Sequence, residues 1–170
     1  MTTGGPPDER AAEFTAWYHD QWHRVWTVLA GACGDPSVAE EARAEAFAKA
    51  YARWDQVRAK ASPSAWVYVV ALNEVRNRVR RARLERQYLA RQAETPHPPP
   101  REPHSDLWAA MRHLPPRMRT ALALRYIADL SEAQVAQVLG VSPGTAASIL
   151  SRGRRRLAEL LDPETEGAHP

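Results

Sequence analysis

The sequence predicts an all-α protein made of two small helical domains that are joined by a proline-rich linker. Apolar residues recur at helical spacing, beginning with the stripe Phe14, Trp17, Tyr18, Trp22, Val25, Val28 and Leu29. Pairs of a capping residue followed by proline mark helix starts at 35–36, 62–63 and 142–143. The run TPHPPPREPH at 95–104 suits neither helix nor sheet, so it separates two helical units.

These breaks divide the chain into five segments. We expect a disordered lead-in at 1–10, a helical domain at 11–92, the linker at 93–104, a second helical domain at 105–161 and a flexible tail at 162–170. In the first domain we expect helices from Phe14 to Ala30, from Pro36 to Trp54 and from Pro63 onwards. The third of these helices is expected to carry Trp66, Val69, Val70 and Asn73 on one stripe.

The composition indicates a globular protein of a reducing compartment. Hydrophobic residues make up 44% of the 170 residues, which is enough to build real cores, and the formal net charge is +3. A single cysteine, Cys33, excludes an internal disulfide and a cysteine-rich zinc site. No apolar run could span a bilayer and no signal peptide is evident, so we expect a soluble cytoplasmic protein without membrane insertion.

The stretch from Leu130 to Leu157 has the pattern of a helix-turn-helix. Ser131 and Gln134 have capping-box spacing, and Gly140 suits the left-handed residue that ends a helix. Ser142 is a good N-cap for a second helix that begins at Pro143.

The second helix of this pair is expected to bury one face and expose a basic one. The inner face carries Ala146, Ile149, Leu150, Gly153 and Leu157, while Ser148, Ser151, Arg152 and Arg155 point outwards. No acidic residue lies between Glu132 and Glu159, so the outer face suits the major groove of DNA. The alternative interpretation is a solvated basic helix in an ordinary bundle.

A second basic surface is expected at the end of the first domain. Seven arginines between Arg76 and Arg91 stand against Glu74 and Glu85, a local balance of 7 − 2 = +5. Trp66 and Tyr68 precede them, and unpaired bases stack on aromatic side chains beside basic grooves. A helix end made soluble by arginine is the alternative.

The two units in this order resemble the extracytoplasmic-function (ECF) sigma factors of bacterial RNA polymerase, over roughly residues 13–161. In the first unit the resemblance depends on Ala39-Glu40-Glu41, Glu45, Phe47, Ala65-Trp66, Asn73 and Arg80-Arg81. In the second it depends on Leu114-Pro115-Pro116-Arg117, Leu130-Ser131-Glu132, Leu139-Gly140-Val141-Ser142, Gly144-Thr145 and Ser151-Arg152-Gly153. The Ser-Arg-Gly ending is similar to an actinobacterial SigE-like subgroup.

The resemblance implies a factor that directs core RNA polymerase to specific promoters and assists promoter melting. It implies core polymerase and promoter DNA as partners, an anti-sigma factor as a further candidate partner, no cofactor and no catalysis of its own. The implied polymerase contacts are Glu40, Glu41, Glu45 and Phe47. The implied minus-ten contacts are Trp66, Asn73, Arg76, Arg80 and Arg81, and the implied upstream contacts are Thr145, Ser148, Ser151, Arg152 and Arg155.

Two departures from the family pattern predict weaker binding. Where the family has Asp-Leu-Val-Gln, the chain has Glu41-Ala42-Arg43-Ala44, which lacks an apolar contact and an amide donor at the polymerase-docking face. Where the family has Val-Lys-Ser-Arg, it has Ala146-Ala147-Ser148-Ile149, which lacks two cations.

Other functions stay open at this point. A helix-turn-helix regulator could act without polymerase, although it would usually dimerise and no dimer helix is evident. A degenerate sigma-like protein could bind partners but read DNA poorly. An enzyme is disfavoured, because His19 and His23 lie one turn apart without a third metal ligand and there is no phosphate-binding glycine loop.

Overall fold

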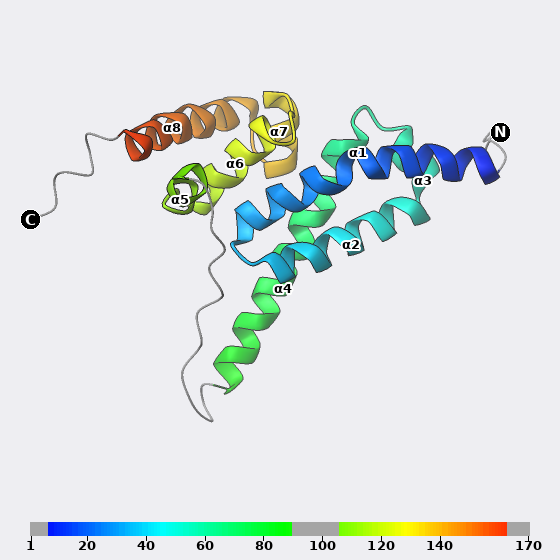
Figure 1. Ribbon diagram of the computed structural model, residues 1–170, viewed down its shortest axis with the longest axis horizontal. Coiled ribbons are helices and arrows are strands. Elements are labelled where there is room, and N and C mark those ends of the chain that lie inside the picture. Colours follow the sequence, from blue (N-terminus) through cyan, green and yellow to red (C-terminus); the bar gives the residue numbers. More distant parts are fainter. Residues whose placement is uncertain (1–6, 90–105, 163–170) are drawn as a thin grey trace, which may run out of the picture.

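The computed structural model describes residues 7–89 and 106–162, and over these residues the chain is helical without strands, as Figure 1 shows. The all-α prediction is confirmed for this part of the chain. The first unit consists of α1 (Pro7–Cys33), α2 (Pro36–Ala52), α3 (Trp54–Arg58) and α4 (Pro63–Leu89). The second consists of α5 (Asp106–Arg112), α6 (Pro116–Tyr126), α7 (Glu132–Leu139) and α8 (Pro143–Leu161). Residues 1–6, the expected linker at 93–104 and the tail from 163 lie outside the described residues.

The first helix begins earlier than the sequence predicts. Residues 7–10 belong to α1, so the expectation of a lead-in up to residue 10 is wrong for this turn. Arg10 holds it in place, because its Nη2 donates to the carbonyl of Tyr51 at 2.9 Å and its Nε lies 3.3 Å from Asp55. These partners come from the ends of α2 and α3, so no local pattern could reveal them.

The predicted helix starts at Pro36 and Pro63 are confirmed. The Asp35 carboxylate accepts from the backbone N–H groups of Ser37 and Val38 at 2.9 and 3.2 Å, and the Ser62 hydroxyl accepts from Ala65 N–H at 3.1 Å. The short helix α3 occupies part of the stretch between Trp54 and Pro63, where no helix was predicted.

Aromatic side chains fill the centre of the first unit. The Phe47 ring lies 5.0–5.6 Å from the rings of Trp17, Tyr18 and Trp22, and Trp54 lies 4.9 Å from Trp17, measured between centroids. This packing joins α1, α2 and α3 into one body.

The buried face of α4 is not the stripe that the sequence predicts. Trp66, Val69 and Val70 are half-buried and Asn73 is exposed. The face that packs on α1 and α2 carries Ala65, Val67, Tyr68, Ala71, Leu72 and Val75. Both stripes have helical spacing, and the choice between them depends on where the neighbouring helices lie.

The two units pack against each other and share one hydrophobic core. Helix α1 lies against α5 and α6, and α4 lies against α7. Arg119 of α6 donates from Nη2 to the carbonyl of Ala32 at the end of α1 at 3.2 Å, and the Trp108 ring of α5 lies directly against Gly31. Among the described helices, none is both long and apolar enough to cross a membrane.

The second half of α4 extends away from this body, as the lower green part of the ribbon shows in Figure 1. From Arg76 to Glu85 only Arg78 is less than exposed, and the apolar Val79 and Leu84 are 47% and 58% exposed. The arginine run therefore stands on a projecting helix.

Candidate nucleic-acid interface

The helix-turn-helix formed by α7 and α8 has the helix caps and the turn glycine that the sequence predicts. The Ser131 hydroxyl accepts from Gln134 N–H at 3.2 Å, and Gln134 Oε1 accepts from Ser131 N–H at 2.8 Å, which completes the capping box of α7. Gly140 has φ +65°, the left-handed conformation that favours glycine. Ser142 then caps α8 by accepting from Thr145 N–H at 3.2 Å.

The predicted inner face of α8 is confirmed. Ala146, Ile149, Leu150 and Gly153 are buried, and the backbone of Gly153 lies so close to Leu122 of α6 that a Cβ there would stand 3.3 Å from its side chain. This close approach fixes the orientation of α8 on α6. The opposite face is therefore turned to solvent.

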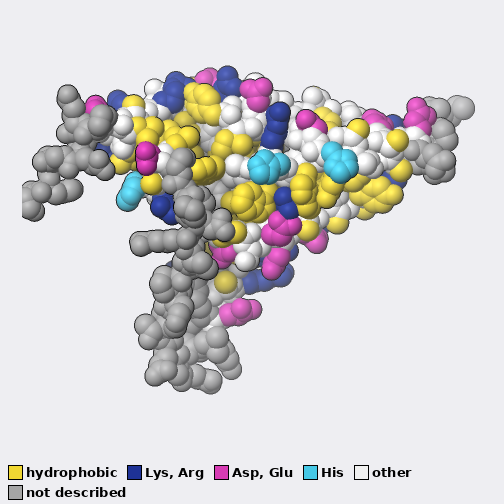
Figure 2. All heavy atoms as spheres, viewed as in Figure 1, with side chains coloured by type: hydrophobic (Ala, Val, Ile, Leu, Met, Phe, Trp, Pro, Cys, Tyr) yellow, Lys and Arg dark blue, Asp and Glu magenta, His cyan; other side chains and the backbone are white. Residues whose placement is uncertain are grey.

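The outer face of α8 exposes the five residues predicted to contact DNA, namely Thr145, Ser148, Ser151, Arg152 and Arg155. Figure 2 shows dark-blue basic side chains along the edge of the molecule over α8, whose basic residues are all arginines. Arg155 makes no ion pair or hydrogen bond with another described residue, while Arg152 only donates to the carbonyl of Ser148 in its own helix at 3.3 Å. Both guanidinium groups are thus available to phosphate or base.

The other two arginines of this stretch are engaged within the protein. Arg154 donates to the Tyr126 hydroxyl at 3.3 Å, and Arg156 pairs with Glu159 at 2.9 Å. Tyr126 thereby ties α6 to the outer side of α8, a contact that the sequence analysis missed because nothing in the local pattern links residues 28 positions apart.

Of the residues predicted to contact the minus-ten element, Arg76, Arg80 and Arg81 lie on the projecting half of α4, Asn73 lies on the turn before it, and Trp66 lies in the first turn of the helix. Asn73, Arg76, Arg80 and Arg81 are exposed and Trp66 is half-buried. Asn73 Oδ1 accepts from Arg76 Nη1 at 2.7 Å, so these two side chains form one polar unit. They can offer amide and guanidinium donors to bases and phosphates.

The suggestion that Tyr68 offers a stacking surface is wrong. Tyr68 is fully buried, and burial raises the pKa of its phenol. Trp66 is the aromatic residue of this segment that keeps an accessible ring.

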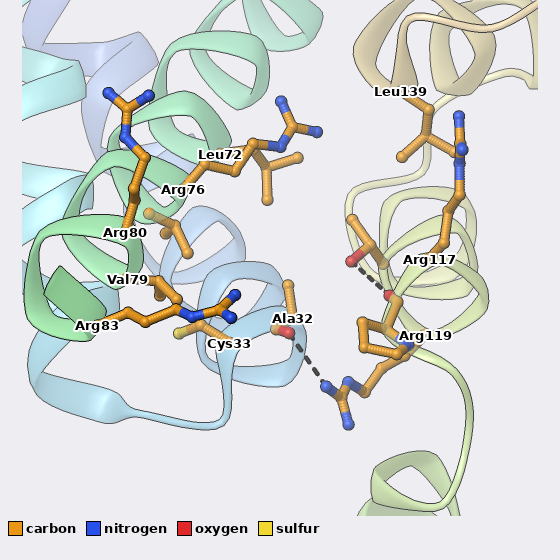
Figure 3. A pocket seen from close by; sticks show the side chains of 13 residues that line it. Ala32, Cys33, Leu72, Arg76, Val79, Arg80, Arg83, Arg117, Arg119 and Leu139 are labelled. Atoms are coloured by element: carbon orange, nitrogen blue, oxygen red, sulfur yellow. Dashed lines mark hydrogen bonds between the residues drawn. The ribbon is translucent and has the colours of Figure 1, made fainter. Parts of the chain in front are cut away.

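A groove of about 760 Å³ lies between α4 and α6, closed below by the end of α1. Its lining includes Arg76, Arg80 and Arg83 from α4 together with Arg117 and Arg119 from α6, and none of its described lining residues is acidic. Figure 3 shows Arg76 and Arg83 reaching from α4 into this space and Arg119 crossing to Ala32. Sequence reasoning did not assign a binding role to Arg117 or Arg119, because they approach the arginine run only through the packing of the two units.

Comparison with known proteins agrees with this two-unit arrangement. Residues 17–85 match the family model for Sigma-70 region 2, and residues 104–157 match that for Sigma-70, region 4. The chain is 31% identical to the RNA polymerase sigma-E factor of Streptomyces coelicolor over 130 aligned residues. This alignment covers 75% of this chain and 73% of that protein. The chain belongs to the ECF group of sigma-70 factors. It is therefore an RNA polymerase sigma factor that acts in transcription initiation.

A further sequence relative supports the assignment, and a solved structure shows the same fold. The ECF sigma factor SigE of Mycolicibacterium smegmatis is 30% identical over 148 residues, which cover 81% of this chain and 57% of that protein. The sigma factor RpoE of Bartonella quintana, solved in complex with the anti-sigma factor NepR, has the same fold, with a TM-score of 0.73. It is 24% identical in sequence, and the match covers 88% of this chain and 96% of that one.

In this sigma factor the acidic side chains predicted to meet polymerase are exposed but already paired. Glu41 lies 3.2 Å from Arg78 of α4, Glu45 lies 3.2 Å from Lys49, and Glu40 pairs with Arg43. Phe47 is 3% exposed and packs in the aromatic core, so it has almost no surface to offer a partner.

Two of the residues of α2 that depart from the family pattern are buried. Ala42 is fully buried, so the missing leucine is a loss to the core and not to a docking surface, contrary to the sequence-based expectation. Arg43 is buried as well, with its guanidinium 3.3 Å from the centroid of the Trp22 ring. Ala44, in place of the family's glutamine, is the departure that lies at the surface.

The described residues contain no group of three or more histidine, cysteine, aspartate or glutamate side chains that could hold a metal ion. Neither matched family region is an enzymatic domain.

Proposed function

We propose that this sigma factor grips promoter DNA at two points, with α4 at the minus-ten element and α8 at the minus-thirty-five element, while the exposed side of α2 contacts core polymerase. The observation that carries the proposal is the presence of two exposed arginine-rich surfaces, one within the region 2 match and one within the region 4 match. The other side of α8 packs in the core, and the core residues of α4 end at Val75, just before its arginine-rich surface begins.

The two surfaces divide the work of recognition. On α8, Arg152 and Arg155 supply phosphate or guanine contacts, and Ser148 and Ser151 supply hydroxyl groups to base edges in the major groove. On α4, the half-buried ring of Trp66 and the Asn73–Arg76 pair suit an unpaired base of the melted strand, because such a base needs a stacking partner and polar contacts.

The cellular setting follows from this role. The protein works in the cytoplasm with core polymerase and does not itself catalyse a reaction. Residues 11–92 and 105–161 act as its two functional domains, joined by the linker at 93–104. An anti-sigma protein is a further proposed partner, supported by the complex in which the Bartonella quintana sigma factor of the same fold was solved.

In vitro transcription with core polymerase tests the proposal. The wild-type protein is expected to bind core and to start transcripts at a defined promoter. Arg152→Ala with Arg155→Ala should reduce this transcription at least about tenfold, because each good base or phosphate contact contributes roughly 1–3 kcal/mol. The control pair, Arg24→Ala with Arg53→Ala, removes the same charge from exposed positions outside both surfaces and should keep near wild-type activity.

A template with a premelted minus-ten region separates the two helices. Arg76→Ala with Arg81→Ala weakens the α4 surface, and part of its lost activity should return on the premelted template because melting is then no longer required. The α8 double variant should show no such recovery. Absence of both core binding and promoter-dependent transcripts would overturn the proposal, and a sharp footprint by the protein alone would favour a regulator that acts without polymerase.

A further inference from the structure

The groove between α4 and α6 concentrates positive charge from both units. Arg76, Arg80 and Arg83 contribute from one side, and Arg117 and Arg119 from the other. Arg80, Arg83 and Arg117 form no hydrogen bond or ion pair with any described residue. The positive charges around the groove repel each other. A bound anion with several negative charges would attract each of them and so offset this repulsion.

The beginning of α6 adds a second source of positive potential. This helix of 11 residues starts at Pro116, and its N-cap residue Pro115 provides no side-chain cap. Pro116, Arg117 and Thr120 of its first turns line the groove. The N-terminal end of a helix carries a partial positive charge, which favours phosphate. Pro116 has no N–H and the Met118 N–H donates to the Pro115 carbonyl at 2.9 Å, so the Arg117 N–H is the backbone donor that this turn can offer.

The lining of the groove also contains apolar side chains. These are Ala32 of α1, Leu72, Val75 and Val79 of α4, and Leu139 of α7. A volume of about 760 Å³ falls within the roughly 300–1,000 Å³ of small-molecule sites, which are usually apolar with a few placed polar groups. The groove therefore suits an anion that has several charges and an apolar part. It also has room for a chain of phosphates without an apolar part.

We propose that this groove binds an anion that carries several linked phosphates, as a nucleoside triphosphate or an inorganic polyphosphate does. Guanidinium groups bind phosphate oxygens in a bidentate manner, and arginines on opposite walls can each take a different phosphate. The bound anion joins α4 to α6 and so holds the first unit against the second.

Titration calorimetry of the full chain with inorganic tripolyphosphate and with ATP tests the site. Both probes are expected to bind at a stoichiometry of about one per chain, as a single groove requires. Arg83→Ala with Arg117→Ala should weaken binding at least about tenfold, because it removes one guanidinium from each wall. Neither residue belongs to the proposed promoter contacts.

The matched control is Arg24→Ala with Arg112→Ala, which removes equal charge from one exposed position in each unit, on α1 and α5, outside the groove. It should keep affinity within about twofold. Tighter binding of ATP than of tripolyphosphate assigns the site to nucleotides, and the reverse order assigns it to inorganic polyphosphate. No saturable binding, or equal losses in the two double variants, would overturn the proposal.

A consequence for promoter binding rests on the proposed function. Arg76 and Arg80 belong both to the groove and to the proposed minus-ten surface. Bound polyphosphate should therefore compete with single-stranded minus-ten DNA, and the competition should be lost in the Arg83→Ala, Arg117→Ala variant. If that variant binds tripolyphosphate normally but loses DNA affinity, the groove belongs to the promoter surface alone and the anion site is refuted. The calorimetry needs neither polymerase nor promoter, so its failure and the failure of the sigma function are distinguishable.

Discussion

On α8, Ala147 and Ile149 stand where the family pattern has cations, and the two side chains have different surroundings. Ile149 is 5% exposed and packs in the core, whereas Ala147 keeps an accessible side. The sequence-based expectation that two groove-facing cations are missing is therefore wrong at 149, since an arginine there would meet the core. One cation is missing from the DNA face.

We predict opposite outcomes when these two cations are introduced. Ala147→Lys should strengthen promoter binding and steepen its salt dependence by about 0.9 in the log–log slope, as one added phosphate contact does. Ile149→Arg should instead lower the free energy of unfolding by about 3 kcal/mol, because it leaves a buried charge without a partner. DNA binding over a range of salt and urea unfolding of both variants check this.

The two substitutions serve as controls for each other, since each adds one positive charge to α8. Equal stability of the Ile149→Arg variant and the wild type would contradict the buried position of residue 149.

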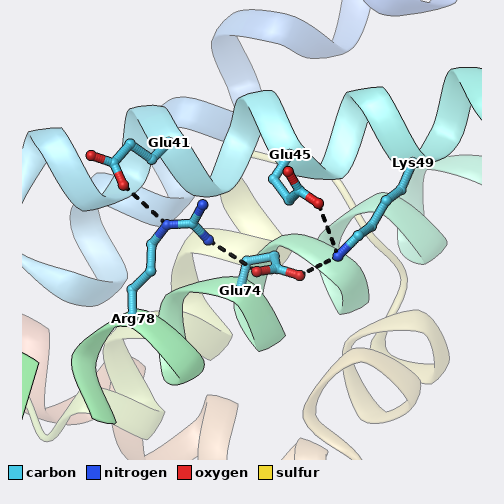
Figure 4. A network of polar contacts seen from close by, with 5 residues as sticks. All are labelled: Glu41, Glu45, Lys49, Glu74 and Arg78. Carbon is cyan, nitrogen blue, oxygen red and sulfur yellow. Dashed lines mark hydrogen bonds and ion pairs between the residues drawn. The ribbon is translucent and has the colours of Figure 1, made fainter. Parts of the chain in front are cut away.

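At the scale of elements, four charged residues tie α2 to α4. Glu74 of α4 pairs with Lys49 of α2 and lies 3.0 Å from Arg78, which in turn lies 3.2 Å from Glu41 of α2 (Figure 4). The Glu74 side chain is 18% exposed, so solvent screens it less than an open surface pair. Hydrogen bonds from Lys49 lower the pKa of Glu74 and raise that of Lys49.

The stability that Glu74 contributes should therefore depend on pH. Because its folded pKa lies below its unfolded value, the contribution is complete above about pH 4.3 and is lost as the pH falls through the folded pKa. Glu74→Gln should lower the free energy of unfolding by about 1 kcal/mol at neutral pH and by progressively less in acid. Urea unfolding at several pH values measures this.

Glu85→Gln is the matched control, since Glu85 is exposed near the end of the same helix and forms no ion pair with a described residue. Its stability should follow the wild type at every pH. A Glu74→Gln deficit of the same size in acid as at neutral pH would show that the lost interaction is not electrostatic.

At the scale of the whole molecule, the two units meet where Gly31 faces Trp108. A Cβ on Gly31 would stand 2.8 Å from Trp108 Cζ3, closer than packed atoms approach. The absence of a side chain at this position lets α5 settle on α1, and the Arg119 hydrogen bond to Ala32 lies next to it.

We predict that Gly31→Ala weakens the contact between the units. Alanine favours the helix by about 1 kcal/mol, but displacing the Trp108 ring costs about 1–3 kcal/mol, so the packed arrangement loses on balance. Small-angle scattering should show a larger radius of gyration. Gly144→Ala is the control, since a Cβ there meets nothing within 4 Å, and its scattering should be unchanged.

Sequence reasoning was most successful where the determinants are local. The capping box at Ser131 and Gln134, the left-handed Gly140 and the inner face of α8 depend on residues within one or two turns, and all are confirmed. It failed on the buried stripe of α4, it did not foresee the burial of Tyr68, and it assigned the buried Phe47 a contact with polymerase. In each case several helical faces were apolar enough to be buried, and the position of the neighbouring helix decided among them.

The sequence by itself determined the capped starts of α2, α4, α7 and α8, the helix-turn-helix with its basic outer face, and the membership of the ECF sigma factors. Only the tertiary structure decided that Arg43 turns inwards onto Trp22, that Ile149 is shielded from DNA, and that the two units share a core with five arginines around one groove. The physical reason is the distance along the chain between the residues that interact. Caps and periodicity are set by hydrogen bonds and spacings over a few residues, whereas the contact between Arg119 and Ala32 joins positions 87 residues apart.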